Sequence, residues 1–361
     1  MDKGYLHLED GTIFEGTLIG AKKDVFGEVV FSTGMVGYTE SLTDSSYRGQ
    51  ILVFTYPLIG NYGVPGFGSK RISESFESEK VQVRGLVVSK LAREYSHFSA
   101  KGSLDNYLKC EGITGIEGID TRMLTVKIRE KGVMLGHLGR EKNIAHFEDP
   151  NAENLVSQAS IARPEILGKG KKKILLLDCG VKNGILSSLL QRKATVIRVP
   201  WNFDPFNPPA GGFSGFSFDG VVVSNGPGDP KKVPETITIV RKIIAKRIPL
   251  LGICLGNQIL ALAAGGETYK LKYGHRSHNQ PVRLAGTKKC FLTTQNHGFA
   301  VDCKKLPGGF EVWFENLNDG TNEGLRHKNL PFMSVQFHPE GRPGPTDTEW
   351  VFDEFIKSLK H

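Results

Sequence analysis

The chain has 361 residues, 39% of them hydrophobic and 23% charged, so it is long enough for two or three domains with large cores. Its formal net charge of +8 comes from basic residues scattered among acidic ones, which argues against a nucleic-acid partner. Five cysteines without a close Cys-x-x-Cys pair favour reduced thiols over a disulfide or zinc framework. No apolar stretch approaches the ~20 residues of a membrane span, and no signal-peptide pattern is present. We therefore expect a cytoplasmic protein without a membrane partner, an organellar form cleaved before Met1 being the alternative.

The first part of the chain alternates short β-branched runs with glycine-rich turns. This pattern is typical of strands, with few helices between them. The expected strands are 27–31, 50–54 and 81–88, and the expected helices are 104–109 and 121–131. We predict a strand-rich α+β domain at 1–150.

The composition changes after this region. Residues 151–172 are polar and contain Pro164, Gly168 and Gly170, which is typical of a linker. From residue 173 onward, apolar strands alternate with helices, which indicates a mostly parallel, doubly wound α/β sheet with both faces covered. The expected strands are 173–178, 195–199, 220–224 and 249–253, and the expected helices are 183–191, 233–245 and 350–359. The second domain is predicted at 173–361.

A cysteine follows the last of these strands. Leu250-Leu251-Gly252-Ile253 leads into Cys254, and Gly256 opens a helix-like pattern. This is the thiol version of a nucleophile elbow, in which a strand turns sharply into a helix and exposes the reactive side chain. The start of the helix favours a thiolate. A buried, inert thiol is the alternative interpretation.

Other segments carry the groups that such a nucleophile needs. His338 and Glu340 follow a strand-like run, and residues two apart in an extended chain point the same way. They predict a base and the carboxylate that orients it. A strand before Gly226 ends in a glycine-rich turn, where backbone N–H groups are able to hold an oxyanion. Residues 295–299 are expected to form a polar loop.

Together these motifs carry a resemblance. Gly-Pro-Gly-Asp-Pro at 226–230, Gly-Ile-Cys-Leu-Gly-x-Gln at 252–258, Gln-Asn-His-Gly-Phe at 295–299 and His-Pro-Glu at 338–340 resemble class I (triad-type) glutamine amidotransferases. More narrowly, the chain resembles the small, glutamine-hydrolysing subunits of carbamoyl phosphate synthetases. The narrower resemblance rests on the N-terminal part, in the motifs at 27–38, 42–47, 56–63 and 118–122.

The resemblance implies a reaction and its partners. Cys254, His338 and Glu340 are the expected catalytic triad, which hydrolyses glutamine to glutamate and ammonia through a glutamyl thioester. A large synthetase subunit is expected to receive the ammonia and to make carbamoyl phosphate from bicarbonate with ATP and Mg. This chain has no Gly-x-x-x-x-Gly-Lys-[Ser/Thr] loop. We expect no cofactor and no metal in it.

The substrate contacts follow from the same resemblance. The backbone N–H groups of Gly226 and Leu255 are expected to hold the oxyanion. The positions that match the remaining glutamine contacts are Ser46, Gly228, Gln258, Asn296, Gly298 and Phe299. Read without the resemblance, Ser46 would stabilise a turn or cap a helix. Gln258 would be a solvated helix residue, and Phe299 would belong to the core.

The chain departs from the family pattern at two positions. Asn257 stands where histidine is common, and Ser45 stands where proline is common; we expect Asn257 to be neutral for the chemistry. The segment 275–278 has histidines at metal-ligand spacing, but we expect no carboxylate or thiol to complete a site, and assign it a structural role.

Two other functions are compatible with these motifs. One is a non-catalytic scaffold that only binds a synthetase partner. The other is an amidotransferase for a different ammonia acceptor, as in anthranilate or guanine nucleotide synthesis. The presence of the whole triad argues against the first, and the N-terminal domain argues against the second. The sequence leaves open whether the product serves pyrimidine or arginine synthesis, and whether the partner is a separate chain.

Overall fold

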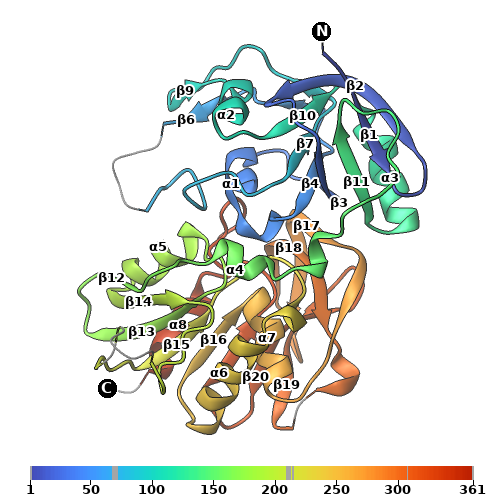
Figure 1. Ribbon diagram of the computed structural model, residues 1–361. Coiled ribbons are helices and arrows are strands. Elements are labelled where there is room, and N and C mark those ends of the chain that lie inside the picture. Colours follow the sequence, from blue (N-terminus) through green and yellow to red (C-terminus); the bar gives the residue numbers. More distant parts are fainter. Residues whose placement is uncertain (1, 67–71, 209–212, 214, 307, 360–361) are drawn as a thin grey trace. The chain divides into compact units, whose positions relative to one another are not determined.

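The structure is a computed structural model that describes residues 2–66, 72–208, 213, 215–306 and 308–359. The chain divides into two compact units, Met1–Glu153 and Asn154–His361 (Figure 1). Among the described residues, no helix combines the length and the apolar character needed to cross a bilayer.

The first unit is built on a sheet of seven strands that closes on itself. In chain order these strands are β1 (Lys3–Leu8), β2 (Ile13–Gly20), β3 (Val25–Ser32), β4 (Gln50–Phe54), β7 (Gly85–Val87), β10 (Thr114–Glu117) and β11 (Met134–Gly139). Around the sheet they follow the order β1-β11-β3-β4-β7-β10-β2. Two small sheets pair β5 (Leu58–Ile59) with β8 (Lys90–Leu91), and β6 (Val64–Pro65) with β9 (Ala100–Gly102). The predicted strand-rich α+β character is confirmed.

The two longer helices of this unit begin at capping side chains. The short elements are α1 (Tyr38–Thr43), η1 (Ser45–Tyr47) and η2 (Pro150–Ala152), and the longer helices are α2 (Leu104–Cys110) and α3 (Thr121–Lys131). Ser103 caps α2 and Asp120 caps α3, each by accepting a hydrogen bond from a backbone N–H of the first turn. Both helices predicted in this region are therefore confirmed.

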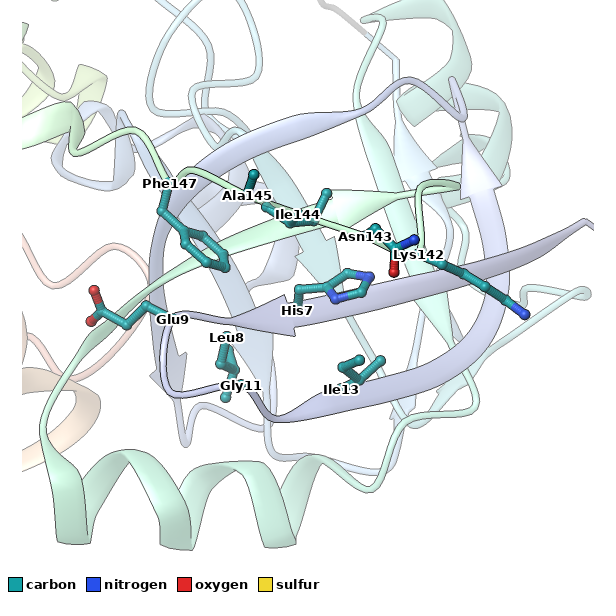
Figure 2. Close-up of a pocket in the computed structure, with 10 residues that line it drawn as sticks. All are labelled: His7, Leu8, Glu9, Gly11, Ile13, Lys142, Asn143, Ile144, Ala145 and Phe147. Carbon is teal, nitrogen blue, oxygen red and sulfur yellow. The ribbon is translucent and has the colours of Figure 1, made fainter.

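The segment that follows β11 borders a hollow with β1 and β2. This hollow has a volume of about 400 Å³, and residues 142–145 together with Phe147 form one of its walls (Figure 2). The ring of His7 lies on its floor, and His7 Nε2 is 2.8 Å from the Glu141 carbonyl oxygen. This contact ties the end of β11 back to β1.

The second unit is built on a 10-stranded sheet. Its order is β12 (Glu165–Leu167), β14 (Ala194–Pro200), β13 (Lys172–Asp178), β15 (Gly220–Val223), β16 (Leu250–Ile253), β21 (Phe332–Val335), β20 (Asn322–His327), β19 (Phe310–Asn316), β17 (Thr268–Leu284) and β18 (Cys290–Val301). The run β14-β13-β15-β16-β21 is parallel, and the other pairings are antiparallel. The predicted parallel strands are confirmed, whereas the antiparallel half was not predicted.

Helices accompany the parallel strands in the order that the sequence predicts. They are α5 (Asn183–Gln191), α6 (Pro234–Ala245), α7 (Leu255–Ala263) and α8 (Trp350–Ser358), with short turns η3 (Pro230–Lys232) and η4 (Cys303–Lys305). Arg192, at the end of α5, forms an ion pair with Asp353 of α8 at 2.6 Å. The strands between the helices are buried along most of their length, as a sheet covered on both faces requires.

The segment predicted to be a linker, 151–172, contains elements of its own. The short helix α4 (Leu155–Ala159) buries Leu155 and Val156, and β12 pairs with β14. The boundary between the two units falls at 153/154, before these elements.

This topology creates one edge at which several strands end. β13, β15, β16 and β21 are parallel neighbours, so the segments that follow them meet at the same edge of the sheet. Those segments begin at Cys179, Ser224, Cys254 and Gln336.

Candidate active site

Cys254 lies at the point where β16 turns into α7, and its backbone is strained. Its φ and ψ angles are 54° and −102°, a conformation that costs a non-glycine residue about 1–3 kcal/mol. A Cβ on Gly252 would lie 2.6 Å from the Gly256 carbonyl carbon, and one on Gly256 would lie 2.9 Å from the Val223 carbonyl carbon. Only glycine fits at both positions, so the predicted elbow is confirmed in its geometry.

His338 and Glu340 form the expected pair. His338 Nδ1 lies 2.8 Å from Glu340 Oε1, and both side chains are fully buried. They do not lie in an extended strand, however. His338 bridges to Thr294, and the Gly341 N–H closes a turn on the His338 carbonyl at 3.2 Å. The pairing was predicted correctly, but a turn, not strand alternation, produces it.

A buried lysine that the sequence analysis missed completes this pair. Lys182 Nζ lies 2.9 Å from Glu340 Oε1 and donates to the Arg342 carbonyl at 2.5 Å. The side chain is 1% exposed, and an ammonium group is rarely so buried without a partner. Lys182 follows β13, so it reaches the same sheet edge as the triad. Its position shortly after a predicted parallel strand was the feature of the sequence that could have identified it.

The charges of this site are strongly coupled. Burial alone raises the pKa of Glu340, but Lys182 and His338 outweigh it and hold that pKa well below its usual value. Burial and Lys182 lower the pKa of His338, while Glu340 and the Cys254 thiol raise it, with the balance at about 10. The protonated form of His338 is therefore favoured at neutral pH, between the Glu340 carboxylate and the sulfur of Cys254.

The thiol and the imidazole are neighbours without a formed hydrogen bond. Cys254 Sγ faces the Asn296 carbonyl oxygen at 3.8 Å. His338 Nε2 is buried and has no hydrogen-bond partner within the described part of the chain, although the thiol is near enough to raise the pKa of this ring. Contacts between catalytic groups are often loose before substrate binds. Nε2 is thus the ring atom available for proton transfer.

Residues 295–299 belong to a strand, so the prediction of a loop there is wrong. They lie within β18, which pairs with the long strand β17. The pairing is irregular between Lys270 and His275 and again between Ser277 and Gln280. This long antiparallel partner, the strand that immediately precedes β18 in the chain, supplies the backbone hydrogen bonds that make a polar segment a strand. The strand brings Asn296 and Phe299 beside the elbow.

Gln258 is not a solvated helix residue, because its side chain is buried and its amide group donates two hydrogen bonds within the protein. Its Nε2 donates to the Phe299 carbonyl at 2.8 Å and to Gln336 Oε1 at 3.1 Å. Both amide hydrogens are used, so Oε1 is the atom left to accept a hydrogen bond from a ligand. The alternative of a surface role is thereby excluded.

Asn257 supports the same network. Its Nδ2 donates to Gln336 Oε1 at 3.1 Å, and its Oδ1 accepts from Ser334 Oγ at 2.8 Å. Asn257 is completely buried. Gln336 therefore accepts from two successive residues of α7, a role that the sequence analysis did not assign to it.

The two residues expected to donate to the oxyanion come from neighbouring segments. A Cβ on Gly226 would lie 2.8 Å from Leu255 Cδ2, so the turn after β15 contacts the first residue of α7. The first N–H groups of a helix have no acceptor within the helix, so that of Leu255 stays the predicted second donor to the oxyanion. Gly228 has a φ of +81°, in the left-handed region that favours glycine.

Gly298 and Ser46 complete the predicted set. A Cβ on Gly298 would lie 3.2 Å from Arg276 Nη2, so the strand passes close to a buried guanidinium. Ser46 belongs to the first unit, where it is buried in η1 and its N–H donates to Asp44 Oδ1 at 2.9 Å. Its contact with glutamine stays a prediction.

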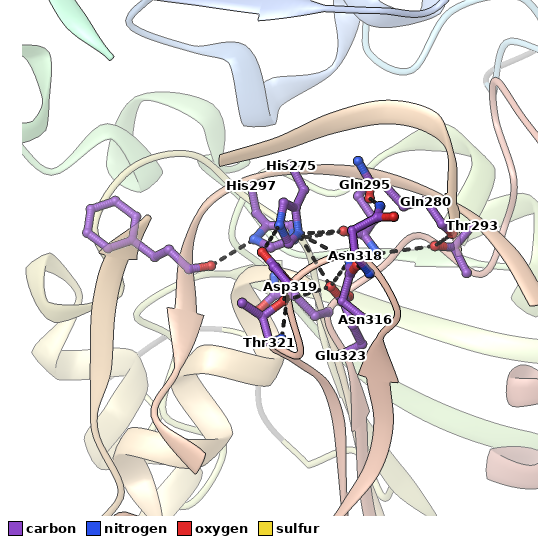
Figure 3. A network of polar contacts seen from close by, with 12 residues as sticks. His275, Gln280, Thr293, Gln295, His297, Asn316, Asn318, Asp319, Thr321 and Glu323 are labelled. Atoms are coloured by element: carbon purple, nitrogen blue, oxygen red, sulfur yellow. Dashed lines mark hydrogen bonds and ion pairs between the residues drawn. The ribbon is translucent and has the colours of Figure 1, made fainter. Parts of the chain in front are cut away.

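One group of buried side chains has the donor atoms of a metal site. Within the described ranges, the ligand atoms of His275, His297 and Glu323 lie within 4.8 Å of one another (Figure 3). The expectation that no carboxylate reaches His275 is wrong, since Glu323 and Asp319 come from the distant β19–β20 region. Each nitrogen of the two rings already faces a hydrogen-bonding group of the protein.

Comparisons with known proteins agree with this geometry. Residues 175–358 match the family described as "Glutamine amidotransferase class-I", and residues 6–138 match "Carbamoyl-phosphate synthase small chain, CPSase domain". The carbamoyl phosphate synthase small chain of Pyrococcus furiosus is 46% identical, over 99% of this chain and 98% of its own length. The arginine-specific small chain of Neurospora crassa is also 46% identical, over 98% of this chain and 79% of its own length.

A third relative is much longer than this chain. The multifunctional protein CAD of Squalus acanthias is 50% identical over 98% of this chain, which spans 16% of that protein. The two family matches follow one another along the sequence, as in a small chain with an N-terminal and an amidotransferase part. This chain belongs to the carbamoyl phosphate synthase small-chain family, and its C-terminal part is a class I glutamine amidotransferase domain.

Proposed function

We propose that this chain hydrolyses glutamine to glutamate and ammonia and supplies the ammonia to carbamoyl phosphate synthesis. The observation that carries the proposal is Cys254 on a strained elbow beside His338, which is bonded to Glu340 at 2.8 Å. A scaffold without catalysis would need neither the strain nor the buried pair. Family membership and the N-terminal match favour carbamoyl phosphate synthesis over a reaction that delivers ammonia to a different acceptor.

The first half of the reaction makes a thioester. Cys254 has passed its proton to His338 Nε2, and the resulting thiolate attacks the side-chain amide carbon of glutamine, so that a C–S bond forms as the carbonyl oxygen becomes an oxyanion. The N–H groups of Gly226 and Leu255 hold that oxyanion, and a single such donor is worth roughly 3–4 kcal/mol. His338 then gives its Nε2 proton to the amide nitrogen, the C–N bond breaks, and ammonia leaves.

The second half releases glutamate. His338, now neutral, takes a proton from water through Nε2, and the water oxygen attacks the thioester carbon. The C–S bond breaks and returns the thiolate. Glu340 keeps the His338 ring oriented throughout with its proton on Nδ1, as the carboxylate of a catalytic triad does. Lys182 keeps Glu340 charged for this purpose.

Glutamine is recognised by groups around the elbow. Gln258 accepts from the α-ammonium group of the substrate, because only its Oε1 is left for a ligand. The other proposed contacts are Ser46, Gly228, Asn296, Gly298 and Phe299. Of these, Phe299 has its carbonyl already engaged by Gln258, so its backbone fixes the position of that side chain.

The proposed partner is a large synthetase subunit or domain. It would use ATP and Mg to join bicarbonate and ammonia, and this chain would need no cofactor or metal for its own step. The N-terminal unit is the proposed contact region, and an enclosed route would keep ammonia from protonation in water. Relatives that include an arginine-specific small chain and the multifunctional protein CAD favour a biosynthetic role of this kind. The five free cysteines favour a cytoplasmic location.

The test separates glutamine use from ammonia use. Cys254→Ser, assembled with the large subunit, should lose glutamine-dependent carbamoyl phosphate synthesis and keep synthesis from added ammonia. Loss of both activities would show that Cys254 is needed for the structure, and retention of both would refute the proposed nucleophile.

A further inference from the structure

Two turns that follow neighbouring strands carry parts of the glutamine site. The β13 turn (residues 179–182) ends in Lys182, and the β15 turn (residues 224–226) ends in Gly226. β13 and β15 are parallel, and the ladder between them stops just before the turns begin. Beyond that point the two backbones leave the sheet, so their N–H groups need other acceptors.

Three buried side chains accept hydrogen bonds from the N–H groups of the β13 turn. The Cys179 N–H donates to Ser224 Oγ at 2.9 Å. The Lys182 N–H donates to Asn225 Oδ1 at 3.0 Å, and the two N–H groups between them donate to Asp178 Oδ1 at 2.7 Å each. All three acceptor residues are completely buried, so breaking one of these bonds leaves a buried polar group unpaired. The bonds to Ser224 and Asn225 therefore join the β13 turn firmly to the β15 turn.

The peptide unit that joins Asn225 to Gly226 is fixed at its carbonyl end. Ser224 Oγ donates to the Asn225 carbonyl oxygen at 2.7 Å. In a trans peptide such as this one, the C=O and the N–H lie in one plane and point in opposite directions. Holding the carbonyl therefore also sets the direction of the Gly226 N–H. A Cβ on Gly226 would lie 3.1 Å from the Cys179 carbonyl carbon and closer still to its oxygen, so the same residue packs directly against the β13 turn.

We propose that Ser224 and Asn225 are positioning residues that fix the Gly226 N–H for the oxyanion. Ser224 holds the carbonyl of the same peptide unit, and Asn225 ties that unit to the β13 turn through Lys182. The inference rests on the proposed glutaminase function and assigns two further residues to the stabilisation of its transition state. Both act through the backbone, so neither side chain needs to touch glutamine.

This junction is separate from the group that is proposed to recognise the substrate. Gln258 is held by the Phe299 carbonyl and by Gln336 Oε1, and neither of these belongs to the two turns. An oxyanion forms only as the thiolate attacks, so its N–H donors act mainly on the transition state. Disturbing the junction should therefore slow the chemistry more than it weakens glutamine binding.

Ser224→Ala is the first test variant, because it frees the carbonyl of the peptide unit and leaves the bond between Asn225 and Lys182 in place. The ion pair of Lys182 with Glu340 is then also unchanged. Complete loss of one oxyanion donor costs about 100- to 1000-fold in kcat, so a displaced donor should cost about 10- to 100-fold. KM for glutamine should change by less than about threefold. Asn225→Ala loosens the same unit from its other side and should show the same pattern.

An aldehyde analogue of glutamine, with CHO in place of the side-chain amide, distinguishes positioning from a general structural effect. The Cys254 sulfur bonds to its carbonyl carbon, and the thiol proton passes by way of His338 to the oxygen, which takes the place of the oxyanion. Transition-state analogues gain the interactions that the substrate makes only in the transition state. The inhibition constant of the aldehyde should therefore rise in both variants by about the factor by which kcat falls.

Asn322→Ala is the matched control, since Asn322 is a buried asparagine of β20 whose Nδ2 donates to the Gly324 carbonyl at 3.0 Å. The full chain with this change should keep the wild-type kcat and inhibition constant, even with a lower unfolding temperature. Wild-type kcat and inhibition constant in folded Ser224→Ala or Asn225→Ala would overturn the inference. A raised KM with an unchanged inhibition constant, or an equal loss of kcat in Asn322→Ala, would also overturn it. A wild type that releases no glutamate would instead contradict the proposed function.

Discussion

Gly252→Ala tests whether the backbone of the elbow controls the reactivity of Cys254. The added methyl would lie 2.6 Å from the Gly256 carbonyl carbon, 3.0 Å from the Asn257 nitrogen, and closer still to the Gly256 oxygen. These are backbone atoms of the first turn of α7, and no flexible side chain is available to move aside. The turn must shift by roughly 0.5 Å, and overpacking of this kind costs about 1–3 kcal/mol of stability.

That shift changes the position of the thiol relative to His338. Misplacement of reacting groups by about 1 Å costs on the order of 100-fold in rate, so we expect kcat for glutamine hydrolysis to fall roughly 10- to 100-fold. The assay is steady-state glutamate release, with thermal unfolding measured in parallel. Synthesis from ammonia with the large subunit should persist, because the ammonia-using site is not in this chain.

Gly308→Ala provides the matched control, because a Cβ there would meet nothing within 4 Å. It should leave both glutamate release and the unfolding temperature unchanged. Wild-type kcat in Gly252→Ala would refute the argument that this glycine is required by the elbow. Equal loss in Gly308→Ala would show that the effect is not specific to the elbow.

Three further predictions concern the buried polar groups. Lys182→Met should destabilise the protein by about 3–5 kcal/mol, since it removes a buried cation from Glu340 and leaves the charge of that carboxylate to His338; denaturant unfolding measures this, and an unchanged midpoint would contradict it. Gln336→Met should raise KM for glutamine about tenfold by releasing the Gln258 amide, and steady-state kinetics with an unaltered KM would show that Gln336 does not hold it. The pKa of Glu340 is depressed in the folded protein, so its stabilising contribution is present above its ordinary value of 4.5 and is lost as pH falls below it. Glu340→Gln should therefore lose less stability than the wild type between pH 5 and 3, and parallel acid-unfolding curves would argue against a depressed pKa.

The parts of the site that are local in sequence were predictable. The elbow needs only a strand, a cysteine and glycines on either side, and all of these lie within nine residues, 250–258. The pairing of His338 with Glu340 was also predicted, although a turn and not an extended strand brings them together. Short-range patterns of residue type were sufficient in both cases.

The parts that depend on pairing and packing between strands were not predictable from pattern alone. Residues 295–299 read as a polar loop because their partner strand, β17, contributes the missing hydrogen bonds. Glu323 reaches His275 across the antiparallel half of the sheet, which the alternation of strands and helices does not indicate. Lys182 gave no local signal, because its burial becomes evident only when the ends of β13 and β21 are placed at one edge.

The most direct measurement of the central claim is glutamate release from glutamine, with and without a large synthetase subunit, beside Cys254→Ala. The proposed mechanism predicts slow release by the chain alone, strong acceleration by the partner, and no release from the variant. Release by Cys254→Ala at the wild-type rate, or no release by the wild type in an assembled complex, would contradict the assignment of Cys254 as the nucleophile of a coupled glutaminase.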